Sequence, residues 1–177
     1  MPRLRRKAGG GPPPQELYAG LRWTALSSGR NGSILRRDAH PDVYGLVADM
    51  PKPAEWTTVV TLGDNTTSMY TSTGGGMTGT GGHAAVAAAS QRLLATVQDH
   101  LAAFGTADDG GYPPYGTVRF HLLTGAAGRY ADVPDEAFWG QAAHPLKPVI
   151  AAMQDVLTSL RELESRYPRR DRTQSGR

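Results

Sequence analysis

Two stretches of the chain repeat apolar residues at helical spacing, and they predict the two longest helices. The first stripe follows one face of residues 83–104, a segment rich in alanine that is expected to end at Gly105. The second, wider stripe predicts an amphipathic helix that begins near Pro145 and ends by Tyr167. The stripes consist of Val86, Leu93, Val97, Leu101 and Phe104 in the first helix, and of Leu146, Val149, Ile150, Met153, Val156, Leu157, Leu160 and Leu163 in the second.

The remaining pattern predicts one short helix and five strands. Leu17, Leu21 and Ala25 recur every four residues, which favours a helix over residues 14–26 with these side chains on its apolar face. The strands are runs of apolar or β-branched residues between turn residues, and a hairpin turn is expected at residues 63–66. The expected strands cover residues 43–50, 56–62, 67–72, 117–124 and 129–133.

The alternation of residues along two of the strands predicts which side chains share a face of the sheet. Proline cannot donate a hydrogen bond within a sheet, so Pro51 is expected to end the first strand. One face of that strand is expected to carry Tyr44, Leu46, Ala48 and Met50. In the strand over residues 117–124, Val118, Phe120 and Leu122 alternate with Arg119, His121 and Leu123.

This order of elements predicts an α+β fold. Strands joined by hairpins favour a five-stranded, mainly antiparallel sheet, and the two long helices are expected to pack on one face of it. The short N-terminal helix is left for the other face or an edge. We expect a single α+β domain over residues 15–167, between a disordered basic arm at residues 1–14 and a disordered basic tail at residues 168–177.

Composition and charge exclude several classes of site. The 177 residues contain no cysteine, which excludes disulfides, a thiol nucleophile and cysteine-ligated metals. The net charge of +3 arises at the chain ends, because residues 8–165 hold 10 basic and 15 acidic residues. Nucleic acid is therefore not an expected partner, except through weak, salt-sensitive contacts of the two ends.

The sequence also indicates in which cellular compartment the protein is expected. No run approaches the roughly 18 apolar residues that span a membrane. The start, MPRLRRK, resembles the charged region of a signal peptide, but GGGPPPQ follows where an apolar stretch belongs. We therefore expect no membrane span and a cytoplasmic protein.

A glycine-rich segment between the third strand and the first long helix is the candidate ligand-binding site. Six of residues 74–82 are glycine, and a helix begins directly after them. Bare backbone and the amides of a helix start suit phosphate or carboxylate, and nearby hydroxyl groups add donors. The alternative is a crossover where another element packs closely on the glycines. The candidate residues are Thr73, Gly74, Gly75, Gly76, Thr78, Gly79, Thr80, Gly81, Gly82 and His83.

No catalytic residue, cofactor or metal site is assigned from sequence motifs. The segment lacks the lysine of a P-loop, and the hairpin order contradicts a dinucleotide-binding unit. The histidines are not at metal-ligating spacing, and no G-x-S-x-G motif is present. Asp132, Asp135 and Glu136 are interpreted as capping residues. Phe138 and Trp139 either fold over the core or are exposed for a partner.

Two segments carry a resemblance to known proteins. Residues 43–104, above all TSMYTSTGGGMTGTGGHAAV, together with HPLKPVIAAMQDVLTSL, resemble a family of short bacterial α+β proteins without an established activity. The element order is loosely similar to profilin-like modules of the roadblock and longin type, which usually run two strands, a helix and three strands. Such modules mostly serve as dimerisation or scaffold platforms.

These observations favour a non-enzymatic, cytoplasmic protein-interaction or regulatory module that binds a protein partner or forms a homodimer. The alternative is a small-anion or nucleotide-binding protein, conceivably an enzyme, that uses the glycine-rich loop at residues 74–83.

Overall fold

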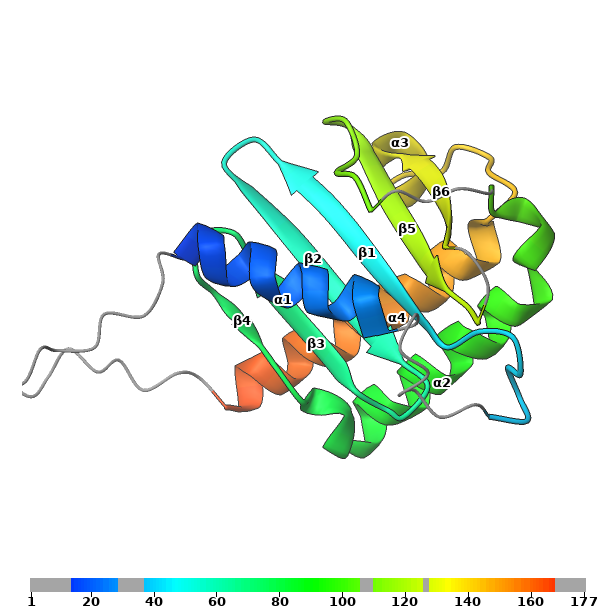
Figure 1. Ribbon diagram of the computed structural model, residues 1–177, viewed down its shortest axis with the longest axis horizontal. Coiled ribbons are helices and arrows are strands. Elements are labelled where there is room, and N and C mark those ends of the chain that lie inside the picture. Colours follow the sequence, from blue (N-terminus) through cyan, green and yellow to red (C-terminus); the bar gives the residue numbers. More distant parts are fainter. Residues whose placement is uncertain (1–13, 29–36, 106–109, 126–127, 168–177) are drawn as a thin grey trace, which may run out of the picture.

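The computed structural model describes residues 14–28, 37–105, 110–125 and 128–167 (Figure 1). The expected basic arm and tail lie outside the described residues, apart from Pro14, which begins the first helix. The elements are α1 (Pro14–Ser28), β1 (Gly45–Lys52), β2 (Glu55–Leu62), β3 (Thr67–Thr71), β4 (Gly76–Met77), η2 (Thr80–Gly82), α2 (Ala84–Asp99), η3 (Leu101–Ala103), β5 (Thr117–Leu123), β6 (Arg129–Pro134), α3 (Asp135–Phe138) and α4 (Lys147–Arg166).

The strands form one antiparallel sheet in the order β4-β3-β2-β1-β5-β6. The first four strands follow one another as a meander, and the chain then crosses through α2 to place β5 beside β1. The α+β class and the antiparallel sheet are confirmed. The expected number of five strands is wrong, because the glycine-rich segment contributes the sixth strand, β4, which pairs with β3 through only two residues.

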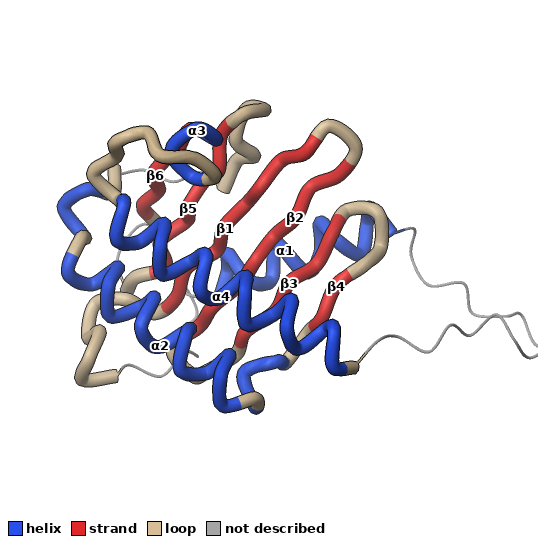
Figure 2. Tube along the Cα trace, turned by 180° about the vertical axis from the view of Figure 1, so that it is seen from behind, coloured by secondary structure: helices blue, strands red, loops and turns tan. Residues whose placement is uncertain are grey.

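The two long helices α2 and α4 lie side by side on one face of the sheet, as Figure 2 shows from behind. Alternation along each strand sends every second side chain towards them, and the two layers bury one large apolar core. The expected helical stripes supply this core, since Leu93 and Val97 of α2 and Ile150 and Met153 of α4 are fully buried. Burial of each such side chain contributes roughly 1.5–3 kcal/mol.

The short helix α1 crosses the opposite face of the sheet (Figure 1). Two of its three expected apolar residues, Leu17 and Leu21, are 50% and 36% exposed, whereas Ala25 is buried as expected. Tyr18 and Arg22 are buried in place of the two leucines. A polar group of α1 therefore lies against the sheet, and the apolar spacing gave no sign of it.

The expectations for the first strand need two corrections. Tyr44 packs with the α1 side of the sheet, whereas Leu46, Ala48 and Met50 belong to the core under α2 and α4. Pro51 does not end the strand, because it lies inside β1 opposite Trp56.

The edges of the sheet are short or interrupted. At one edge, Gly76 has a φ of 136°, a conformation that favours glycine, and a Cβ there would collide with the carbonyl oxygen of Met69. At the other edge, β6 ends in Pro134, and the carbonyl of Tyr130 accepts a hydrogen bond from the Gly105 amide at 2.8 Å. In the described part of the chain, no helix is long and apolar enough to cross a membrane.

Candidate functional site

Three strands place polar side chains on the sheet face that α1 covers. On β1, Ala48 and Met50 point into the core under α2 and α4, so Asp49 between them points towards α1. Asp49 lies opposite Thr58 of β2 in the register, and His121 of β5 lies one diagonal position away. Asp49, Thr58 and His121 are all completely buried.

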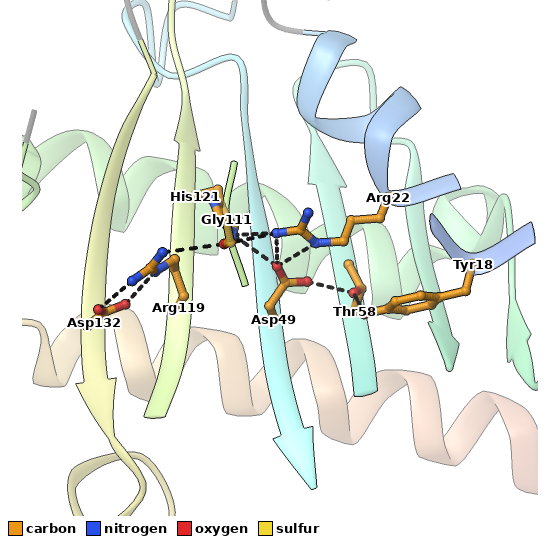
Figure 3. Close-up of polar contacts among 8 residues, drawn as sticks. All are labelled: Tyr18, Arg22, Asp49, Thr58, Gly111, Arg119, His121 and Asp132. Atoms are coloured by element: carbon orange, nitrogen blue, oxygen red, sulfur yellow. Dashed lines mark hydrogen bonds and ion pairs between the residues drawn. The ribbon is translucent and has the colours of Figure 1, made fainter. Parts of the chain in front are cut away.

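Arg22 of α1 completes this group with its guanidinium (Figure 3). Its Nε donates to Oδ2 of Asp49 at 2.7 Å, and its Nη2 lies 2.6 Å from the same oxygen. His121 Nε2 is 2.9 Å from this oxygen and 3.2 Å from Arg22 Nη2. Since the carboxylate oxygen can only accept, the geometry makes both side chains donors to Asp49.

The second carboxylate oxygen of Asp49 continues the hydrogen bonds towards α1. Thr58 Oγ1 donates to Asp49 Oδ1 at 2.6 Å. Because the Thr58 hydroxyl proton is used there, the Tyr18 hydroxyl donates to Thr58 Oγ1, at 2.7 Å. We call Tyr18, Arg22, Asp49, Thr58 and His121 the buried network.

The environment shifts the pKa values of these groups in directions that keep the network charged. Burial alone would raise the pKa of Asp49, but the hydrogen bonds from His121 and Arg22 and the charge of Arg22 hold it below its usual value. Burial would lower the pKa of Arg22, yet the hydrogen bond and charge of Asp49 raise it. Burial raises the pKa of Tyr18, whose hydroxyl therefore stays protonated and keeps donating.

The buried network also holds the loop before β5. Arg22 Nη2 donates to the Gly111 carbonyl at 3.2 Å, and Arg119 Nη1 donates to the same oxygen at 3.3 Å (Figure 3). Arg119 is itself fixed by two bonds to Asp132, at 2.7 and 2.8 Å. Two guanidinium groups therefore anchor one carbonyl of the loop, and the next residue is Tyr112.

This anchored loop presents aromatic rings to the solvent. Tyr112 and Tyr115 are 46% and 67% exposed, and both contact Trp56 of β2, with ring centroids 4.7 and 5.9 Å apart. The Arg22 guanidinium lies 4.0 Å from the centre of the Tyr112 ring, which ties this ring to the buried network. We call Trp56, Tyr112 and Tyr115 the aromatic surface.

The buried network suits positioning rather than reaction with an external molecule. Both oxygens of Asp49 are engaged, and neither Asp49 nor His121 is exposed at all. An external molecule would reach them only if α1 left the sheet. The arrangement joins α1, the sheet and the loop that carries Tyr112.

Six of the ten predicted site residues border three separate hollows, and the other four border none of these three. Gly75 and Gly76 line a hollow beside α4. Gly79, Gly81 and Gly82 border a shallow one at the β2–β3 turn, and His83 borders a third at the start of α2.

Several polar groups of the glycine-rich segment bond to the protein itself. The Gly75 amide donates to Thr71 Oγ1 at 3.1 Å, and the Gly79 amide donates to Ser68 Oγ at 3.2 Å. The Thr80 hydroxyl is buried and donates to a carbonyl of β3. These contacts favour the alternative in which the glycines permit close approach of neighbouring elements.

Close approach is clearest at Gly81, where a Cβ would collide with the Asn65 carbonyl of the β2–β3 turn. Among the other candidates, Thr73 donates to Glu55 Oε2 at 2.8 Å, and Thr73, Gly74, Thr78 and His83 are exposed.

Other residues singled out in the sequence have separate surroundings. Within the described ranges, no group of three or more His, Asp or Glu side chains is arranged to hold a metal ion. Asp132 pairs with Arg119, whereas Asp135 and Glu136 lie in the first turn of α3, where negative charge is favourable. Phe138 is fully buried and Trp139 is 48% exposed.

The sequence patterns missed the buried network. A charged Asp49 inside an apolar strand was a usable signal, because such a residue is seldom buried without a partner. Nothing in the sequence pointed to Arg22 or His121 as that partner, since they lie 27 and 72 residues away.

No protein-family model, curated protein or solved structure gives a significant match to the chain. The resemblance to short bacterial α+β proteins therefore rests on sequence motifs alone.

Proposed function

We propose that the protein is a non-enzymatic, cytoplasmic interaction module whose aromatic surface binds an extended, proline-containing segment of a partner protein. The observation that carries this proposal is the contact of three partly exposed rings, Trp56 on β2 with Tyr112 and Tyr115 on the loop that two guanidinium groups hold. Exposing aromatic rings to water is unfavourable, so an exposed group of rings often marks a binding surface. Here the guanidinium groups of Arg22 and Arg119 hold the loop that carries two of these rings.

The chemistry of the rings supports a protein partner. Tyrosine, tryptophan and arginine are the residues that most often dominate binding energy at interfaces. Tyrosine and tryptophan offer a large contact area and lose little side-chain entropy. Because the Gly111 carbonyl is already fixed, little further ordering is needed when a partner binds.

The shape of the aromatic surface favours a proline-containing segment. The rings of Tyr112 and Tyr115 are inclined at 61° and 40° to Trp56, which makes the surface ridged rather than flat. Polyproline II segments dock on aromatic-lined surfaces of this kind, because their stiff backbone is already extended before binding.

Fluorescence titration with a decaproline peptide tests the proposal. In the double variant Trp23→Phe/Trp139→Phe, Trp56 is the sole remaining tryptophan and reports directly on the surface. We expect a saturable change in emission, and Tyr115→Ala in this background should weaken binding at least tenfold, about 1.4 kcal/mol. Tyr167→Ala is the matched control, because Tyr167 is 68% exposed at the end of α4, compared with 67% for Tyr115.

Two results would overturn the proposal. One is equal affinity of the Tyr115→Ala and Tyr167→Ala variants for the peptide. The other is absence of peptide binding together with self-association that Tyr115→Ala abolishes in sedimentation, which would assign the surface to a second copy.

A further inference from the structure

The hollow beside α4 that Gly75 and Gly76 line, which we call the corner pocket, lies on the opposite face of the sheet from the aromatic surface. It has a volume of about 340 Å³ and lies between α4 and the ends of β1, β2 and β3. Figure 2 shows that the β1–β2 and β3–β4 hairpins extend past α4 at this corner. Sites for small ligands start at roughly 300 Å³, so the hollow suits a molecule at the small end of that range.

The floor of this corner pocket is apolar. Met50 of β1 and Leu157 of α4 are 3% and 4% exposed, and Met69 of β3 lies beside them. Trp139 borders the pocket with almost half of its surface exposed. Gly75 and Gly76 form one side with backbone only, which leaves space that side chains would fill.

Charged side chains of both signs surround this floor. The sheet contributes Lys52 and Glu55, and α4 contributes Arg161 and Glu164, so each layer offers one cation and one carboxylate. Among the residues that the structure describes, Lys52, Arg161 and Glu164 have no opposite charge within 4 Å. Glu55 accepts a hydrogen bond from Thr73 at 2.8 Å.

We infer that the corner pocket binds a free amino acid with an apolar side chain. The ammonium group of such a ligand meets Glu164, because Glu55 already accepts from Thr73, and its carboxylate meets Arg161, which offers two parallel donors. The apolar side chain lies on Met50, Met69 and Leu157 against the Trp139 ring. An anion alone would leave Glu55 and Glu164 facing its charge, and a cation alone would face Lys52 and Arg161.

This inference stands apart from the proposed function. The pocket lies on the face of the sheet that α2 and α4 cover, whereas Trp56 belongs to the α1 side. It also gives Gly75 and Gly76 a place in ligand binding that does not require their amides as donors.

Tryptophan emission tests this inference as well, with a different reporter. The variant Trp23→Phe/Trp56→Phe leaves Trp139 alone at the pocket. L-leucine and L-phenylalanine are titrated beside analogues that lack the carboxylate (isoamylamine, phenethylamine) or the amine (isocaproate, hydrocinnamate). We expect saturable binding of at least one amino acid, confirmed by calorimetry on the unmodified chain, and at least tenfold weaker binding of both its analogues.

Charge variants locate the binding. Arg161→Gln and Glu164→Gln should each weaken binding of the amino acid at least tenfold. Arg92→Gln on α2 and Glu162→Gln on α4 are matched controls, since both residues are exposed and neither lines the pocket. The inference is overturned if neither amino acid binds in calorimetry, if an analogue binds as tightly as its parent, or if the controls weaken binding equally.

Discussion

Replacing Asp49 by asparagine should destabilise the protein strongly. The substitution keeps the size of the side chain and removes the charge that three donors share. Arg22, which is 5% exposed, would then remain buried without its carboxylate. Breaking a buried ion pair by removing one partner costs about 3–5 kcal/mol.

Thermal unfolding followed by far-UV circular dichroism measures this effect. For a domain of this size, 1 kcal/mol corresponds to about 2–4 °C, so Asp49→Asn should lower Tm by about 6–20 °C. Asp132→Asn is the control, because the Asp132 side chain is 36% exposed in its pair with Arg119. Exposed pairs contribute at most about 1 kcal/mol, so the control should change little.

The pH dependence gives a second measurement on the same variant. The pKa of Asp49 is lower in the folded protein, so its stabilising effect is complete above the unfolded value near 3.9 and is lost as the pH falls towards the folded value. The difference in stability between the wild type and Asp49→Asn should therefore be full at neutral pH and shrink below about pH 4.

The reasoning fails if Asp49→Asn costs no more than Asp132→Asn, or if the difference between wild type and Asp49→Asn is independent of pH. The first result would mean that equivalent contacts replace the carboxylate, and the second would mean that the cost of the substitution does not arise from its charge.

Two pairs of variants test other parts of the fold by urea denaturation. Tyr70→Phe should raise the free energy of unfolding by about 1 kcal/mol, because the buried Tyr70 hydroxyl has no hydrogen-bond partner among the described residues. Tyr18→Phe should lower it by about the same amount, because it removes the hydrogen bond to Thr58. A loss of stability in both variants would contradict this. Gly81→Ala should cost about 1–3 kcal/mol through its collision with the Asn65 carbonyl, and Gly82→Ala, with nothing within 4 Å, should stay within about 0.5 kcal/mol. Equal costs for the two glycines would refute the close approach.

The long elements were predictable because one physical rule decides each of them. Apolar periodicity located α2, α4 and the strand positions, since those residues are chosen for burial against a second layer. The same rule was misleading for α1, where the best apolar spacing belongs to Leu17 and Leu21, yet Tyr18 and Arg22 are buried. Pairing with Asp49 decides which face of this helix is buried.

The parts that were missed depend on contacts between distant residues. Strand β4 has two residues and no pattern of its own, so only its pairing with β3 reveals it. Arg22 and His121 are 99 residues apart in the sequence. They come into contact only because the chain crosses over to place β5 beside β1, and no sequence pattern reveals that crossover. The glycine-rich segment was recognised as unusual, but its separation among three hollows follows from the way the chain turns there.

The interrupted edges of the sheet have a consequence for how copies of this chain can meet. A neighbouring strand extends a sheet only where a row of backbone groups is open and straight. Here one edge is two residues long with a left-handed glycine, and the other ends in Pro134 with the Tyr130 carbonyl already occupied. Fibril-like stacking through these edges is therefore disfavoured, and so is pairing of two copies strand to strand.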